Sequence, residues 1–193
     1  NYYQEPVGQI VKLFFPTFFL NTPPVTRALE IPPQVLQHQH PTIVLGSFAE
    51  RIAYYSTAVR EAYAKKQSII IFAPTLAVLE YIASSLSHLP LNLVVLHGSL
   101  TPKQTRLACE RIVAKTSPSL VIASPLSLGL LSGFEDIIII EDSDSPHYSR
   151  KERPRIHTAK ALTLFAQHIR AKCIEGKMLP SMRDLKDERQ LQY

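Results

Sequence analysis

The stretch 137-IIIIEDSDSP-146 places four isoleucines directly before three acids, Glu141, Asp142 and Asp144. Four consecutive β-branched apolar residues are typical of a strand that is buried on both faces, as in a parallel sheet covered by helices. The acids have two interpretations. Either they mark the point where a buried strand returns to solvent, or they hold a metal-bound phosphate and activate a water molecule at the edge of the sheet. This stretch alone leaves both interpretations open.

Similar apolar runs recur along the chain and alternate with longer segments whose apolar residues have helical spacing. The expected strands are 42–46, 68–73, 91–97, 119–124, 136–141 and 171–175, and the expected helices are 48–65, 76–86, 102–114 and 157–170. This alternation implies right-handed crossovers and a doubly wound, mainly parallel α/β sheet flanked by helices. Ligands of such sheets bind beyond the carboxyl ends of the strands. The residues at those ends are Gly46-Ser47, Pro74-Thr75, His97-Gly98-Ser99, Ser124-Pro125 and Glu141-Asp142.

The N-terminal part of the chain has a different character. Residues 1–20 predict a short helix from Glu5 to Phe15, which Pro16 ends, and residues 21–41 contain five prolines. Because proline removes a backbone donor and fixes φ, we interpret 21–41 as a linker. The α/β domain is therefore expected at 42–193.

Composition narrows the class of protein. Apolar residues make up 46% of the 193 residues and charged residues 19%, which is typical of a globular and not a disordered chain. No apolar run reaches the roughly 20 residues that a membrane span needs. Cys109 and Cys173 stand apart without a CxxC partner, so we expect no zinc site, a reducing compartment and a cytoplasmic protein. A net charge of +5 is compatible with a nucleic-acid partner.

The turn in 45-LGSFAERIA-53 lies where a phosphate-binding loop would follow the first expected strand. Such a loop needs several glycines, a lysine and a Ser or Thr for magnesium. Here Gly46 is the glycine of the turn, Arg51 could supply positive charge, and Ile52 offers no hydroxyl. An ordinary turn, in which Ser47 caps the helix, is favoured.

Basic residues gather in 149-SRKERPRIHTAK-160. This run is either a solvated loop or a surface that contacts the phosphates of DNA without reading sequence. His97 ends the third expected strand at the same sheet edge as Glu141, and a lone histidine there is either structural or part of the binding surface.

A longer segment carries a resemblance to a known family. The run 138-IIIEDSDSPHYSRKERPRIHTAKAL-162 resembles the segment around the DEEH box of primosomal protein N′, the bacterial replication-restart helicases of superfamily 2. In that family the box is followed by a Tyr, then by Pro-Arg-x-His and a helix. Tyr148, Pro154, Arg155 and His157 stand at that spacing.

Three further segments follow in the order of this family. The segment 2-YYQEPVGQIVKLFFP-16 is similar to the helix that ends the family's N-terminal DNA-binding region. The segment 96-LHGSLTPKQTR-106 resembles LHSxLS, and 176-GKMLPS-181 stands where the family has GSATPS. The resemblance covers nearly the whole chain and implies the first RecA-like lobe of a helicase.

The chain departs from the family at the nucleotide site. The family's phosphate-loop lysine and threonine fall on Arg51 and Ile52, and its glycines on Phe48 and Glu50. The DEEH box has become 141-EDSD-144, and 124-SPLS-127 lacks the family's arginine. The sequence contains no counterpart of the second lobe, its zinc-binding cysteines or the winged-helix domain. Each lost charge-assisted contact is worth about 1.5–3 kcal/mol, so we predict that ATP turnover is lost or nearly so.

The resemblance implies DNA, forked or single-stranded, as a partner, with replication proteins as further candidates and ATP and magnesium as cofactors only if the altered site still works. Two alternatives stay open: an active ATP-dependent helicase completed by a second lobe, and a protein-interaction module without DNA contact. The candidate site residues are Glu141 and Asp142 for catalysis, Glu141 for magnesium, Gly46, Ser47 and Arg51 for the nucleotide, and Lys151, Arg153, Arg155, His97 and Tyr148 for DNA.

Overall fold

The computed structural model describes residues 40–89, 92–113, 118–130, 136–149, 156–181, 184 and 191–192. The helix predicted from Glu5 to Phe15, the predicted linker except its last two residues, and the basic residues Lys151, Arg153 and Arg155 lie outside the described residues.

A parallel sheet forms the centre of the described part of the chain. Its strands are β1 (Thr42–Leu45), β2 (Ile69–Phe72), β3 (Asn92–Leu96), β4 (Ser119–Ala123), β5 (Ile137–Ile140), β6 (Lys172–Lys177) and β7 (Leu191–Gln192). Their order is β3-β4-β2-β5-β6-β1-β7, and every pairing among these strands is parallel. The predicted α/β sheet is therefore confirmed. Two differences are the short strand β7, which was not predicted, and β6, which continues to Lys177.

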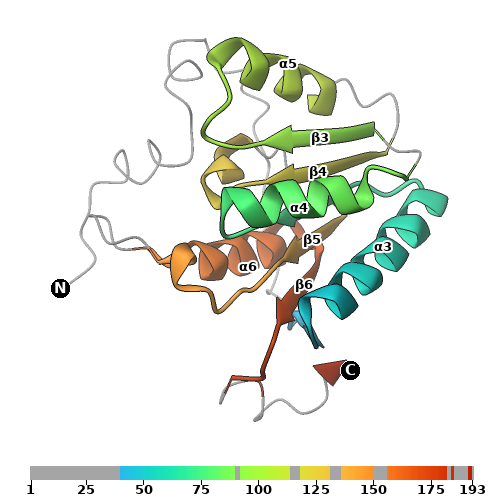
Figure 1. Cartoon of the computed structure of the whole chain (residues 1–193), viewed down its shortest axis with the longest axis vertical. Coiled ribbons are helices and arrows are strands. Elements are labelled where there is room, and N and C mark those ends of the chain that lie inside the picture. The colour runs from blue at the N-terminus through green and yellow to red at the C-terminus, as the bar shows by residue number, and fades with distance from the viewer. Residues whose placement is uncertain are drawn as a thin grey trace.

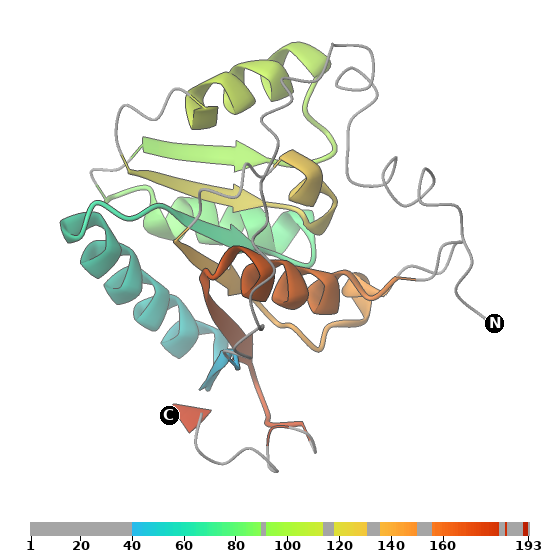
Figure 2. The same cartoon turned by 180° about the vertical axis from the view of Figure 1, so that it is seen from behind.

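Helices cover both faces of this sheet. They are α3 (Phe48–Ala64), α4 (Leu76–Leu86), α5 (Pro102–Val113) and α6 (Thr158–Ile169), with short 3-10 turns η1 (Pro125–Leu130) and η2 (Pro146–Tyr148). From β1 to β3 the chain moves in one direction along the sheet, and from β3 to β6 it moves back. Since crossovers are right-handed, α3 and α4 lie on one face and α6 on the other, as Figures 1 and 2 show. Among the described helices, none is long and apolar enough to cross a membrane.

The isoleucine run of β5 contacts the helices on both faces of the sheet. Ile137 and Ile139 pack with α3 and α4 in one core cluster, whereas Ile138 and Ile140 pack with α6 in the other. Successive side chains of a strand point to opposite faces, so an unbroken apolar run is what a strand between two helical layers requires. Glu141, the residue after Ile140, therefore lies at a sheet edge that helices cover on both faces.

Candidate functional site at the carboxyl edge of the sheet

Three strand ends meet where the sequence predicts the nucleotide site. Strand β6 pairs with β5 on one side and with β1 on the other. The Gly46 N–H donates to Lys177 O at 3.2 Å, and the Ser143 N–H donates to Gly176 O at 3.2 Å. The turns that follow β1 and β5 are thereby tied to the end of β6.

Arg51 and Glu141 form a buried ion pair across this edge. Arg51 projects from the first turn of α3, and its Nη2 donates to Glu141 Oε1 at 2.5 Å while Nε lies 3.1 Å from Oε2. Its Nη1 donates to Gly46 O at 2.6 Å. The Tyr55 hydroxyl donates to Glu141 Oε2 at 2.5 Å. Glu141 is 1% exposed and Arg51 5% exposed, so both charges are removed from water and satisfied by each other.

The pKa shifts agree with a closed pair. Burial alone lowers the pKa of Arg51, but the hydrogen bonds and the charge of Glu141 outweigh it, so that the net pKa is raised. Burial raises the pKa of Tyr55 well above its usual value, and the charge of Glu141 raises it further. At neutral pH Arg51 is therefore charged, and Tyr55 remains a neutral donor to the carboxylate.

Gly176 allows this cluster to close. A Cβ placed at Gly176 would lie 1.9 Å from Tyr55 Oη and 2.7 Å from Glu141 Oε2. A glycine is therefore needed because the Tyr55–Glu141 hydrogen bond passes against its backbone. Neither Gly176 nor Tyr55 was among the predicted site residues. A signal for Tyr55 was present, since it stands one helical turn after Arg51 and therefore shares its face of α3.

The turn after β1 is occupied by its own side chains. Ser47 and Glu50 form a capping box, in which the Ser47 N–H donates to Glu50 Oε2 at 2.7 Å and the Glu50 N–H donates to Ser47 Oγ at 3.4 Å. The predicted capping role of Ser47 is confirmed. Because α3 begins at Phe48, only Gly46 and Ser47 connect strand and helix. The Glu50 carboxylate thus accepts the Ser47 N–H at the N-terminus of α3.

The two acids after β5 have separate environments. Glu141 points into the Arg51–Tyr55 cluster, whereas Asp142 is half-buried and has a φ of +50°, a left-handed conformation that aspartate tolerates. Among the described residues, no group of three or more His, Cys, Asp or Glu side chains is arranged to hold a metal ion. A magnesium ion at Glu141 would have to displace Arg51 or Tyr55 from the carboxylate.

Tyr148 and His97, which were predicted to bind DNA, have different environments. Tyr148 is 0% exposed, and its hydroxyl lies 2.8 Å from Glu141 O and 3.1 Å from Phe72 O. Tyr148 therefore packs in the core, which corrects the prediction that it contacts DNA. His97 lies at the same sheet edge as Glu141, but β4 and β2 stand between their strands. Its Nδ1 is buried without a hydrogen-bond partner among the described residues.

A second charged cluster surrounds Lys177, beside the first. Lys177 Nζ lies 3.0 Å from Asp184 Oδ2, 3.3 Å from Glu175 Oε2 and 3.5 Å from Asp144 Oδ1. Burial lowers the pKa of Lys177, but these three carboxylates outweigh it and raise the net pKa. The sequence pattern did not indicate this cluster, because β6 was expected to end at residue 175.

The comparisons with known proteins support the fold. No protein-family model matches the chain, and no curated protein sequence matches it either. The C-terminal domain of S. cerevisiae Dbp5, solved with Gle1 and IP6, has 12% identity and a TM-score of 0.54, with 76% of this chain and 79% of that domain covered.

Two further structures are more distant. The C-terminal domain of a possible DNA helicase from Lactobacillus plantarum has 12% identity and a TM-score of 0.44, covering 72% of this chain and 73% of that one. Domain 2 of the DEAD-box helicase Mss116p, bound to an RNA duplex, has 14% identity and a TM-score of 0.47, covering 75% of this chain and 66% of that one. Together with the parallel sheet between two helical layers, the likeness to the Dbp5 domain shows that the chain has the RecA-like α/β fold of helicase domains. The assignment to a first lobe stays a prediction.

The Arg51–Glu141 pair gives a stability prediction. Replacing Glu141→Gln leaves the Arg51 charge buried without its carboxylate and is expected to lower the free energy of unfolding by about 3–5 kcal/mol. Replacing the three partners together, with Arg51→Met, Tyr55→Phe and Glu141→Leu, is expected to recover most of that loss. Urea unfolding of the single and the triple variant measures both changes in the free energy of unfolding.

The control for this prediction is Glu110→Gln in the exposed Arg106–Glu110 pair, with an expected change below about 0.5 kcal/mol. A Glu141→Gln cost as small as that of the control would contradict the prediction.

Asp184 gives a pH prediction. Burial raises its pKa, but the Ser181 hydrogen bonds and Lys177 outweigh this, so the net pKa is lowered from 3.8. A lowered folded-state pKa stabilises the fold above the ordinary value and loses that contribution as pH falls through the folded-state value. The difference in unfolding free energy between wild type and Asp184→Asn should therefore be full at neutral pH and shrink below pH 3.8. Urea unfolding of both proteins across this range measures it, and a difference independent of pH would argue against the ion pair.

Proposed function

We propose that this chain is a helicase-lobe-like domain of the primosomal protein N′ type that has lost, or nearly lost, ATP hydrolysis. It acts in DNA replication restart or repair through contacts with DNA, forked or single-stranded, and with replication proteins. The observation that carries the proposal is the closed Arg51–Glu141–Tyr55 cluster, which fills the place between the turns after β1 and β5.

Phosphoryl transfer needs free groups at this place. Backbone amides and a lysine hold the phosphates, an acid holds the magnesium through water, and another group orients the attacking water. Here the Gly46 and Ser47 amides donate to Lys177 O and Glu50, and the Glu141 carboxylate accepts from Arg51 and Tyr55. The two amides of the turn and the Glu141 carboxylate therefore already have internal partners.

The energy of opening the cluster indicates how strongly nucleotide binding is disfavoured. Releasing Glu141 to a metal would leave Arg51 buried and unpaired, at a cost of about 3–5 kcal/mol. Because about 1.4 kcal/mol corresponds to a factor of ten, this cost weakens binding by roughly two to four orders of magnitude. Micromolar binding at an open site would become about 0.1 mM or weaker here.

The scaffold that could hold DNA is retained. The two core clusters are intact, and the carboxyl edge presents Thr75 at the N-terminus of α4 and the exposed Ser99 before α5. Hydroxyls and helix N-termini at such an edge suit phosphate groups, whose binding supplies affinity without sequence preference. Together with the net charge of +5 and the run that contains Lys151, Arg153 and Arg155, this favours DNA as the partner. His97 lies at the same edge as a further candidate contact.

The proposal predicts that the chain does not bind ATP. Titration with a fluorescent ATP analogue and magnesium should give no saturable signal in the micromolar range, because the cluster must open first. Asp142→Ala serves as the control, since it removes the half-exposed acid and leaves the cluster closed. Saturable micromolar binding that Asp142→Ala abolishes would overturn the proposal and favour an active helicase completed by a second lobe.

The proposal also predicts DNA binding that falls steeply with salt. Fluorescence anisotropy with forked and single-stranded DNA should show weaker binding for the double variant Arg153→Gln and Arg155→Gln, with a salt slope reduced by about 1.4 on single strands. The matched control removes two exposed charges from the C-terminal part of α3 and its C-cap, with Arg60→Gln and Lys65→Gln. Equal weakening in both variants would reject the basic run as the contact. No binding even at low salt would leave a protein-interaction module.

A further inference from the structure

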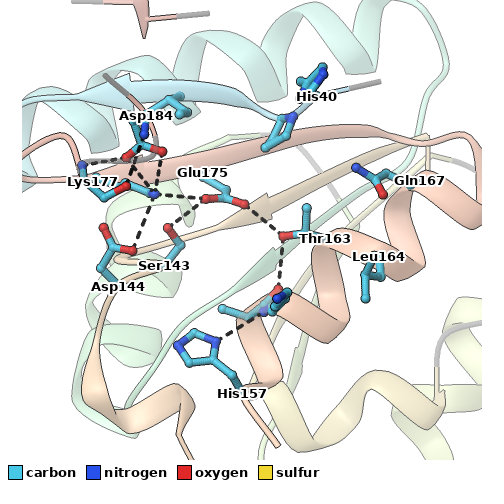
Figure 3. A pocket seen from close by; sticks show the side chains of 15 residues that line it. His40, Ser143, Asp144, His157, Thr163, Leu164, Gln167, Glu175, Lys177 and Asp184 are labelled. Carbon is cyan, nitrogen blue, oxygen red and sulfur yellow. Dashed lines mark hydrogen bonds and ion pairs between the residues drawn. The ribbon is translucent and has the colours of Figure 1, made fainter. Parts of the chain in front are cut away.

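A cavity of about 490 Å³ opens on the face of the sheet that carries α6 (Figure 3). Its walls come from α6, from the β6 residues Glu175 and Lys177, and from Ile43 of β1. Its volume lies within the range of roughly 300–1,000 Å³ that is usual for ligand pockets. The cavity is separate from the Arg51–Tyr55 cluster, because Glu175 and Lys177 alternate with Gly176 along β6 and therefore face the other side of the sheet.

The inner wall of the cavity has more negative than positive charge. Lys177 is buried there, and Asp144, Glu175 and Asp184 surround its Nζ at 3.0 to 3.5 Å. One ammonium therefore stands against three carboxylates. His157 and Lys160 also line the cavity, but both are exposed residues of its rim.

The carboxylates differ in how far their partners satisfy them. Asp184 is held by Lys177 and the Ser181 N–H. Glu175 accepts from Ser143 Oγ at 3.1 Å and from Thr163 Oγ1 at 2.9 Å, which fixes its orientation toward the cavity. The Asp144 side chain is 55% exposed and reaches Lys177 through Oδ1 at 3.5 Å. Asp144 can therefore rotate toward a bound cation, whereas the Glu175 carboxylate beside Asp144 already has a fixed orientation.

The chemistry of the wall selects the kind of cation. Among the described residues, no group of three or more His, Cys, Asp or Glu side chains is arranged to hold a metal ion, and Lys177 already lies among these carboxylates. An organic cation can instead place its N–H groups on Asp144 and Glu175 through charge-assisted hydrogen bonds. Ile43 and the 58% exposed Leu164 line the same cavity and offer apolar contact to a methylene stem.

We propose that this cavity is a docking site for an arginine or lysine side chain of a polypeptide partner. The charged head of that side chain binds Asp144 and Glu175, and its stem lies along Ile43 and Leu164. The four contact residues belong neither to the Arg51–Tyr55 cluster nor to the basic run, of which His157 and Lys160 reach the rim of the cavity. It adds a protein-recognition site to the opposite side of strand β6.

The test is a titration followed by amide NMR. The probe is the tripeptide acetyl-Ala-Arg-Ala-amide, and its matched control replaces arginine by citrulline, which has nearly the same shape without the charge. Saturable shifts are expected at Thr163, Glu175 and Lys177, with the citrulline peptide at least about tenfold weaker, since it lacks charge-assisted bonds. Equal binding of both peptides, or shifts located elsewhere, would overturn the proposal.

Variants of the protein test the wall itself. Asp144→Asn should weaken the arginine peptide about fivefold to tenfold, as the loss of one partly exposed charge-assisted bond predicts. Glu175→Gln is the second variant, and thermal unfolding verifies that both remain folded. The control Glu80→Gln removes one exposed acid from α4, on the other face of the sheet, and should leave affinity unchanged. Equal affinity in wild type and both wall variants would reject the site.

Free agmatine distinguishes the source of the cation. It carries the guanidinium without a peptide backbone, and it should bind more weakly than the tripeptide if the cavity and its rim recognise a polypeptide. Tighter binding of agmatine than of the tripeptide would reject the polypeptide and assign the cavity to a small organic cation.

Discussion

The buried ion pair between Arg51 and Glu141 is the constraint on which the carboxyl edge of this sheet depends. Two unpaired charges could not be kept in the interior, since each loses its hydration on folding. Paired, and joined by the Tyr55 hydroxyl, they tie the start of α3 to the end of β5 across β6. A residue without a side chain is required at Gly176, because the hydrogen bond between Tyr55 and Glu141 passes directly against its backbone.

The same pair sets the character of the edge after β1 and β5. The Arg51 guanidinium binds the acid after β5, and the Glu50 carboxylate caps the N-terminus of α3. The proposed loss of ATP binding rests on these internal partners. The isoleucines Ile137 to Ile140 pack with the helices of the two core clusters.

Strand β6 separates two charged clusters with different character. On one side of it, Arg51 and Glu141 are matched one to one and enclosed. On the other, Lys177 faces three carboxylates beside an open cavity. Alternation along a strand places neighbouring residues on opposite faces, so the short segment from Glu175 to Lys177 contributes residues to both clusters. The enclosed cluster has no unmatched charge, and the cluster at the cavity is the one proposed to bind a cation.

The sequence by itself determined the α/β sheet, its strand and helix positions and the Ser47 cap, because apolar periodicity and capping chemistry act over a few residues. It also identified Arg51 and Glu141 as unusual residues. Only the tertiary structure decided that they bind each other, since they stand 90 positions apart and meet through the order of β5, β6 and β1. The burial of Tyr148 and the cluster around Lys177 were decided in the same way, because strand order and the true end of β6 set which side chains share a space.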